Sequence, residues 1–78
     1  MAKRSITVAG HRTSISLEEP FWHGLAEIAS ATRTSVPSLV TTVDRSRSEG
    51  LSLSAALRLH VLDWYRQQAK GSRPDVTR

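Results

Sequence analysis

The chain has 78 residues, of which 38% are apolar, and it contains no cysteine. The apolar share is too high for a disordered protein, and the lack of cysteine excludes disulfides and thiolate metal sites. Eleven Lys and Arg against seven Asp and Glu give a formal net charge of +4. The basic residues gather toward both ends of the sequence, which suits a polyanionic partner such as a nucleic acid. The alternative interpretation is that these basic residues only keep the protein soluble.

A domain of this size buries only about 60% of the surface of its unfolded chain, so it is marginally stable by itself. Small domains commonly gain stability from disulfides, a metal or a partner subunit, and association is the remedy left here. No segment approaches the roughly 20 apolar residues of a membrane span, and the N-terminus lacks the apolar region of a signal peptide. We therefore expect a cytoplasmic protein that associates with a second copy and has no membrane partner.

The N-terminal part of the sequence has the alternating pattern of β-strands. Residues 1–4 are expected to form a basic arm, and residues 5–8 are a β-prone stretch that ends before Gly10, a residue suited to positive φ. Residues 12–17 alternate polar and apolar side chains and predict a strand. Its inner face would carry Thr13, Ile15 and Leu17, and its outer face Arg12, Ser14 and Ser16.

A first helix is predicted from about Glu18 to about Ala31. Ser16 and Glu19 have the spacing of a capping box, and Pro20 would lie in the first turn, where its missing N–H costs least. Apolar residues at helical spacing predict a buried stripe. The stripe comprises Phe21, Trp22, Leu25, Ile28 and Ala29.

A second helix is expected to begin after Ser35, a favourable N-cap, and to end before Gly50, which is typical of the position after a helix. Its apolar face would be formed by Val36, Leu39, Val40 and Val43.

A third helix follows from about Ser52, with an apolar stripe that comprises Leu53, Leu57, His60, Val61, Trp64 and Tyr65. Leu59 and Leu62 lie off this stripe, so the helix is apolar over a wide arc, which again implies a second subunit. Residues 69–78 have the composition of a flexible basic tail.

One strand followed by helices is an unusual order, because a lone strand leaves its backbone donors and acceptors unpaired. A second copy of the chain would supply the partner strand, and the resulting two-stranded ribbon is narrow enough for the major groove of DNA. The alternative is that residues 4–8 fold back on residues 12–17 as a hairpin. A dimer would then have four strands about 4.8 Å apart, a poor fit to a groove about 12 Å wide.

The order strand, helix, turn, helix resembles that of the ribbon-helix-helix DNA-binding proteins, the superfamily of the Arc and MetJ repressors. The resemblance is carried by residues 13–17 (Thr-Ser-Ile-Ser-Leu) and 33–40 (Arg-Thr-Ser-Val-Pro-Ser-Leu-Val). Residues 3–6, 10–18, 21–22 and 53–59 are similar to a compact bacterial subfamily of ribbon-helix-helix domains. The resemblance implies a mainly α fold with a short β-ribbon, arranged as an intertwined homodimer. The domain would span residues 5–68, with an additional C-terminal helix and a possible extra N-terminal strand.

The resemblance also implies that the paired strands lie in the major groove, so that Arg12, Ser14 and Ser16 contact bases. Arginine binds guanine with two hydrogen bonds, whereas serine is permissive, which predicts modest discrimination between sequences. The alternative is an ordinary solvated strand face, and Ser16 also has its competing role as a helix cap.

Phosphate contacts are expected at two further places. The free amides at the start of the second helix suit a phosphate, together with Arg33, Thr34 and Ser35. Lys3 and Arg4 of the basic arm would contact a second backbone phosphate. The alternative for the start of the second helix is a helix cap that binds no ligand. The alternative for Lys3 and Arg4 is an N-terminal arm that has no role in binding. The dimer core is expected to comprise Ile15, Leu17, Phe21, Trp22, Leu25, Leu39, Val43, Leu57, Val61 and Trp64.

No pattern in the sequence indicates catalysis, since there is no phosphate-binding glycine loop and no recognised nucleophile and base. The three histidines lack the spacing of metal ligands. We therefore expect no enzymatic activity, no cofactor and no metal. The sequence favours a homodimeric DNA-binding regulator of transcription. The alternative is an adaptor or antitoxin-like module of the same fold that binds a protein instead of DNA.

Overall fold

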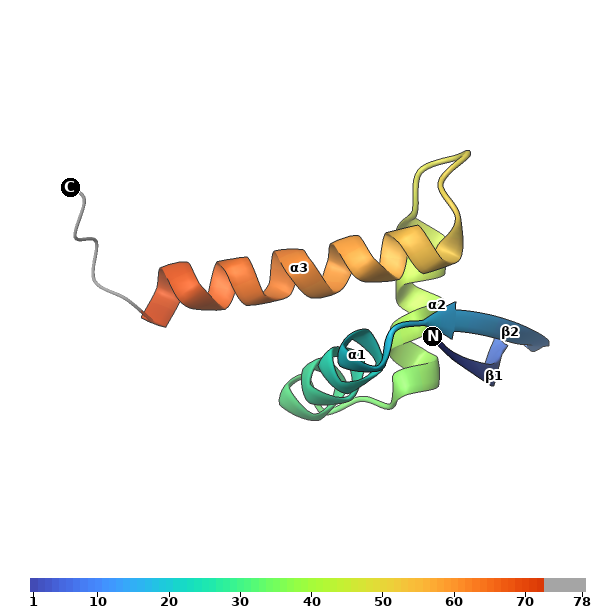
Figure 1. Cartoon of the computed structure of the whole chain (residues 1–78), viewed down its shortest axis with the longest axis horizontal. Coiled ribbons are helices and arrows are strands. Elements are labelled where there is room, and N and C mark those ends of the chain that lie inside the picture. Colours follow the sequence, from blue (N-terminus) through green and yellow to red (C-terminus); the bar gives the residue numbers. More distant parts are fainter. Residues whose placement is uncertain (73–78) are drawn as a thin grey trace.

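A computed structural model describes residues 1–72 of the chain. The elements follow the order β1 (Ala2–Val8), β2 (His11–Leu17), α1 (Glu19–Ala31), α2 (Val36–Ser46) and α3 (Leu53–Ser72). The hairpin lies at one end of the molecule, and α3 extends away from it past α1 (Figure 1). The predicted mainly α fold with a short β-ribbon, an extra N-terminal strand and an additional C-terminal helix is confirmed.

The two strands pair with each other. β1 runs antiparallel to β2, with a register that extends from Ala2 opposite Leu17 to Val8 opposite His11. Ala9 and Gly10 form the turn with φ of 52° and 84°, and positive φ at both positions is the signature of the type I′ turn that suits the twist of a hairpin. The expectation that the strand lacks a partner in its own chain is therefore wrong, and the hairpin alternative is the one that forms.

The basic arm expected at residues 1–4 is largely absorbed into this hairpin, since β1 begins at Ala2. The indole Nε1 of Trp22 in α1 donates a hydrogen bond of 2.9 Å to the carbonyl oxygen of Ala2. This bond fixes the first residue of β1 to the helix that follows the hairpin.

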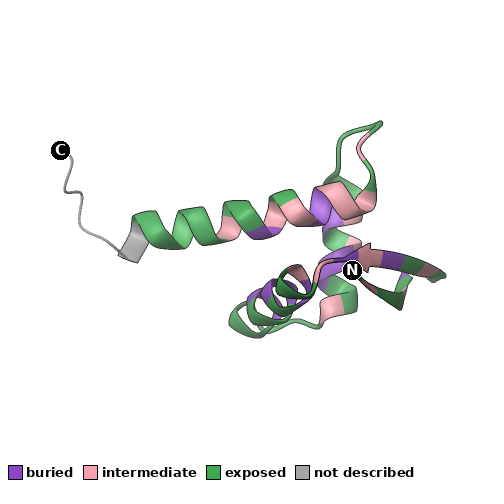
Figure 2. Cartoon of the chain, in the orientation of Figure 1, coloured by how far each residue is buried: buried purple, intermediate pink, exposed green. Residues whose placement is uncertain are grey.

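The core lies where the inner face of the hairpin meets α1, α2 and the first half of α3 (Figure 2). Eight of the ten side chains expected in the dimer core are buried within the single chain: Ile15, Leu17, Trp22, Leu25, Leu39, Val43, Leu57 and Val61. Phe21 and Trp64 are half-buried and pack against these residues. The apolar stripes of α1 and α2 are thus confirmed as core-facing.

Both helices start where expected, but the cap of α1 differs from the prediction whereas the cap of α2 agrees with it. Glu18, not Ser16, is the N-cap of α1, and it makes no capping bond through its side chain. Ser16 lies within β2, which continues to Leu17. The predicted capping box is therefore wrong. Ser35 caps α2 as predicted, since its Oγ accepts a hydrogen bond of 3.2 Å from the Ser38 amide.

The carboxylate of Glu18 is engaged with α3 instead. Nε of Arg58 donates to it at 2.9 Å, and this hydrogen bond lowers the pKa of Glu18 below its ordinary value. The contact joins residues that are far apart in the sequence, at the point where the hairpin leads into α1.

The ends of α2 and α3 also differ from the sequence prediction. α2 ends at Ser46 with Arg47 as its C-cap, and Gly50, with φ of 88°, turns the loop before α3 instead of ending the helix. α3 continues to Ser72, so residues 69–72 of the expected tail are helical. Residues 73–78 of that tail lie outside the described residues.

Within the described residues, no helix is both long and apolar enough to cross a bilayer.

Gly24 lets α1 and α3 approach closely. A Cβ at this position would lie 2.8 Å from Cγ1 of Val61, which is closer than real side chains come. Val61 is β-branched and on a helix, so its rotamer has little freedom to yield.

Gly24→Ala is therefore expected to lower the free energy of unfolding by about 1 to 3 kcal/mol, although alanine favours helix in general. Urea denaturation followed by circular dichroism measures the change. In a Val61→Ala background, Gly24→Ala should cost less than it does in the parent. A Gly24→Ala protein as stable as the parent would contradict the close packing.

Candidate nucleic-acid interface

The hairpin has one polar face that is turned away from the core. Strand alternation places Lys3, Ser5 and Thr7 of β1 on the same side as Arg12, Ser14 and Ser16 of β2. These six residues are direct cross-strand neighbours, since Lys3 lies opposite Ser16, Ser5 opposite Ser14 and Thr7 opposite Arg12. All are exposed except Ser16, which is half-buried. We call this surface the outer ribbon face.

The outer ribbon face carries positive charge and no carboxylate. Lys3 and Arg12 form no ion pair with any described residue, whereas Arg4, Arg47 and Arg58 do. Arg58 pairs with Glu18 and Arg47 with Asp44, at 2.9 and 2.7 Å. The charges of Lys3 and Arg12 are therefore available to a partner outside the chain.

Ser16 has no duty as a helix cap, because Glu18 takes the N-cap position of α1. Its carbonyl oxygen accepts a hydrogen bond of 3.2 Å from Oγ of Ser54 in α3. The structure thus brings Arg12, Ser14 and Ser16 together in one row, with the competing role of Ser16 removed.

Sequence reasoning missed Ser5 and Thr7, because it treated residues 5–8 as an element separate from the ribbon. The signal was present in the sequence, since Lys3, Ser5 and Thr7 are polar at every second position while Ala2, Ile6 and Val8 are apolar. That alternation matches the alternation of β2 and predicts that the two strands share a sheet with one solvent-exposed face.

Arg4 is not on the outer ribbon face. Its guanidinium lies 5.0 Å from the ring centre of Trp22 and 3.4 Å from Oε1 of Glu19. The structure therefore separates Arg4 from Lys3, although the two are adjacent in the sequence.

The start of α2 presents exposed Arg33, Thr34 and Ser35. Arg33 has φ of 57°, and the amides of Arg33 and Thr34 donate to the carbonyl oxygens of Ser30 and Ala29 at 3.2 and 2.8 Å. This is the Schellman pattern that ends α1, with an arginine where glycine is usual. The cost of a left-handed arginine at this turn is about 1 kcal/mol.

Arg33→Gly is accordingly expected to raise the free energy of unfolding by about 1 kcal/mol, measured by urea denaturation. Ser30→Gly serves as the matched control, because Ser30 is exposed and still helical. It should lower the free energy of unfolding by roughly 0.5 kcal/mol. A loss of stability in Arg33→Gly would show that the arginine side chain makes a stabilising contact.

The ionisable side chains of residues 1–72 do not assemble into a metal centre. Among the described residues, no three of His, Cys, Asp and Glu lie close enough to hold a metal ion. His23 approaches a carboxylate, with Nε2 at 3.9 Å from Oε1 of Glu19 on the same helix.

The fold and this surface define a class of small helical proteins that present a two-stranded polar ribbon. The ribbon-helix-helix domain family matches residues 1–65, and the chain belongs to that family. Among solved structures it is similar to an uncharacterized protein from Bordetella pertussis Tohama I, with 28% identity and a TM-score of 0.73. That similarity covers 96% of this chain and 63% of the other, so this chain spans less than two thirds of the other's length. No curated protein matches the sequence significantly.

Proposed function

We propose that the protein binds duplex DNA as a regulator of transcription, with the outer ribbon face in the major groove. The observation that carries the proposal is a two-stranded hairpin whose exposed face holds two unpaired cations and no carboxylate. Two strands about 4.8 Å apart fit a groove about 12 Å wide. Because both strands come from one chain, groove entry needs no strand from a partner.

Arg12 would read guanine with two hydrogen bonds, and Ser14 and Ser16 would add permissive contacts. Thr7 lies opposite Arg12, so its hydroxyl and methyl groups are placed to contact the neighbouring base. One arginine among hydroxyl side chains supports strong preference at one base pair and weak preference beside it.

Phosphate contacts would position the ribbon without reading sequence. Lys3 at the open end of the hairpin, and the side chains of Arg33, Thr34 and Ser35 before α2, are exposed and suited to this role. The backbone amides of Arg33 and Thr34 already donate to α1, so they are not free for a phosphate. The Arg4 side chain is 51% exposed, so its ion pair with Glu19 is weak, and Arg4 is free to exchange Glu19 for a phosphate.

A homodimer is part of the proposal. α3 exposes three large apolar side chains, Leu59, Leu62 and Tyr65, with exposed fractions of 54%, 51% and 38%. Burial of these side chains against a second copy would stabilise a small domain. Contact through α3 would also leave each hairpin as a two-stranded ribbon, whereas pairing of β2 with its own copy would produce the four-stranded sheet that fits the groove poorly.

The experiment is selection of bound sequences from random duplexes by the purified protein, at two salt concentrations. We expect a short enriched motif, and an affinity that falls steeply as salt rises because bound phosphates release counterions. Recovery of unenriched sequences with no dependence on salt would contradict the proposal.

A second candidate, a protein-binding adaptor or antitoxin-like module, is favoured by the same exposed leucines on α3. An exposed apolar surface of this kind is typical of a protein interface. The two candidates differ in what Leu62→Glu would do. A DNA-binding dimer would lose mass in sedimentation and lose duplex affinity together, whereas an adaptor would bind no duplex before or after the change.

A further inference from the structure

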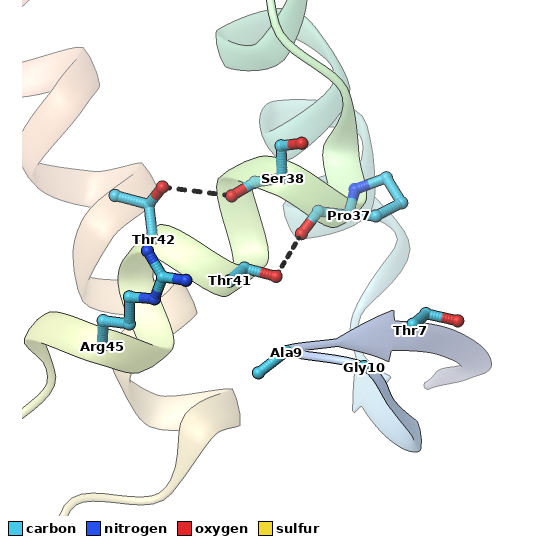
Figure 3. A pocket seen from close by; sticks show the side chains of 8 residues that line it. All are labelled: Thr7, Ala9, Gly10, Pro37, Ser38, Thr41, Thr42 and Arg45. Atoms are coloured by element: carbon cyan, nitrogen blue, oxygen red, sulfur yellow. Dashed lines mark hydrogen bonds between the residues drawn. The ribbon is translucent and has the colours of Figure 1, made fainter.

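An open groove of about 500 Å³ separates the hairpin turn from α2 (Figure 3). Thr7, Ala9 and Gly10 line it from the hairpin, and Ser38, Thr42 and Arg45 line it from α2. Its two walls are far apart in the sequence and meet because Val8, at the end of β1, is buried in the core beside α2.

The donors in this groove are limited to a few side chains. The hydroxyl groups of Thr41 and Thr42 donate to the carbonyl oxygens of Pro37 and Ser38, at 2.9 and 3.1 Å, so their hydrogens are already used (Figure 3). The hydroxyl groups of Thr7 and Ser38 and the guanidinium of Arg45 make no bond to any described side chain or backbone group. The hydroxyl of Thr7 lies on the outer ribbon face and points away from α2, so the groove itself offers Ser38 as a neutral donor and Arg45 as a cation (Figure 3).

The charge of the groove is positive and uncompensated. No carboxylate of the described residues lines it. Asp44, the residue next to Arg45, is turned to Arg47, with 2.7 Å between its Oδ1 and the Arg47 Nε. Arg45 is exposed and lies in the last turn of α2, where a cation also favours the helix dipole.

The groove is continuous with the outer ribbon face. Thr7 belongs to both surfaces, since it lines the groove and stands opposite Arg12 on the ribbon. A ligand that extends past Arg12 at the turn end of the hairpin would enter the groove next.

The geometry points to a binding site for the sugar–phosphate backbone of DNA in this groove, with Arg45 as the phosphate-binding residue and Ser38 as a supporting donor. This inference rests on the proposed function. It adds a phosphate contact at the C-terminal end of α2 to the phosphate contacts proposed at its N-terminal end. A phosphate contact of this kind positions the protein and carries no sequence information.

The test compares the parent protein with Arg45→Gln and with Arg66→Gln, which removes the same charge from an exposed position on the distant part of α3. Binding to the selected duplex and to an unrelated duplex is measured by fluorescence anisotropy over a series of salt concentrations. Arg45→Gln is expected to weaken binding to both duplexes roughly fivefold to tenfold and to reduce the slope against log salt by about 0.9. Arg66→Gln is expected to match the parent.

A second variant, Thr42→Glu, places a carboxylate at an exposed position within the groove and is expected to weaken binding to both duplexes at least as much. Thermal melts confirm that all variants are folded. If the parent binds and Arg45→Gln keeps its affinity and salt slope, the binding site in the groove is overturned while the proposed function stands. A change in which sequence is preferred would also overturn it, since Arg45 would then read a base. A parent that binds no duplex overturns both inferences.

Discussion

Arg12→Ala is expected to weaken binding to the selected duplex by about tenfold to a hundredfold, which corresponds to the loss of one two-bond contact to guanine. Arg12 is exposed and has no ion pair with a described residue, so its removal breaks no ion pair within the described part of the chain. The free energy of unfolding should therefore stay within about 0.5 kcal/mol of the parent value. Fluorescence anisotropy measures the affinity, and urea denaturation measures the stability.

The effect on specificity separates Arg12 from residues that bind phosphate. Repeated selection with the Arg12→Ala protein should lose preference at one base pair, whereas Lys3→Ala should weaken all duplexes about equally. If Arg12→Ala binds its best duplex as tightly as the parent does, the outer ribbon face does not lie in the major groove.

Trp22→Ala is expected to lower the free energy of unfolding by about 3 to 5 kcal/mol. The side chain is 2% exposed at the centre of the core, and its Nε1 donates to the carbonyl oxygen of Ala2. A domain of this size has a total stability of about 4 to 12 kcal/mol, so the loss is about a quarter of the total or more, and at the low end of the range the variant would unfold at room temperature. Urea denaturation, or loss of the helical circular dichroism signal, measures the effect.

Two further variants show how much of the loss comes from packing and how much from the bond to Ala2. Trp22→Phe keeps an aromatic ring and removes the donor, so it should cost less and should release hydrogen-exchange protection at residues 2–4 before other regions. Trp64→Phe is the matched control, because Trp64 is half-buried and packs at the edge of the core. Equal losses in Trp22→Phe and Trp64→Phe would mean that the indole does not anchor β1.

Trp22 also links stability to the proposed function. It fixes β1 to α1, and Arg4 stacks over its ring at 5.0 Å. A hairpin whose first strand is detached would expose its inner face and lose the register that places Lys3 opposite Ser16. Trp22→Phe is therefore expected to weaken binding to DNA by a smaller factor than Arg12→Ala does.

Local patterns allowed much of the fold to be predicted. The stripes of α1 and α2 are confirmed because a helix of marginal stability must bury its apolar side, and spacing reveals that side directly. Ser35 is confirmed as the cap of α2 because a serine before a helix satisfies a free amide within three residues. Both predictions depend on neighbours in the sequence.

Predictions failed where a distant residue changed the outcome. Ser16 and Glu19 have the spacing of a capping box, yet Ser16 remains in β2 because β1 pairs alongside it. Glu18 then takes the N-cap position and binds Arg58 of α3, which is 40 residues away in the sequence. The prediction for Gly50 is a failure of local origin, since α2 ends at Ser46 and Gly50 turns the loop before α3.

The order of residues was enough to establish the polar row Arg12, Ser14 and Ser16, the helices and their buried sides, since side-chain alternation and helical spacing are local properties. Which strand pairs with β2 follows only from the folded structure. Because β1 is that strand, Lys3, Ser5 and Thr7 lie on the same face as Arg12, Ser14 and Ser16. Folding also brought the turn of the hairpin beside α2 and formed the groove at Arg45. The physical reason is that strand pairing and helix packing join residues distant along the chain, and their geometry follows from the burial of a shared core.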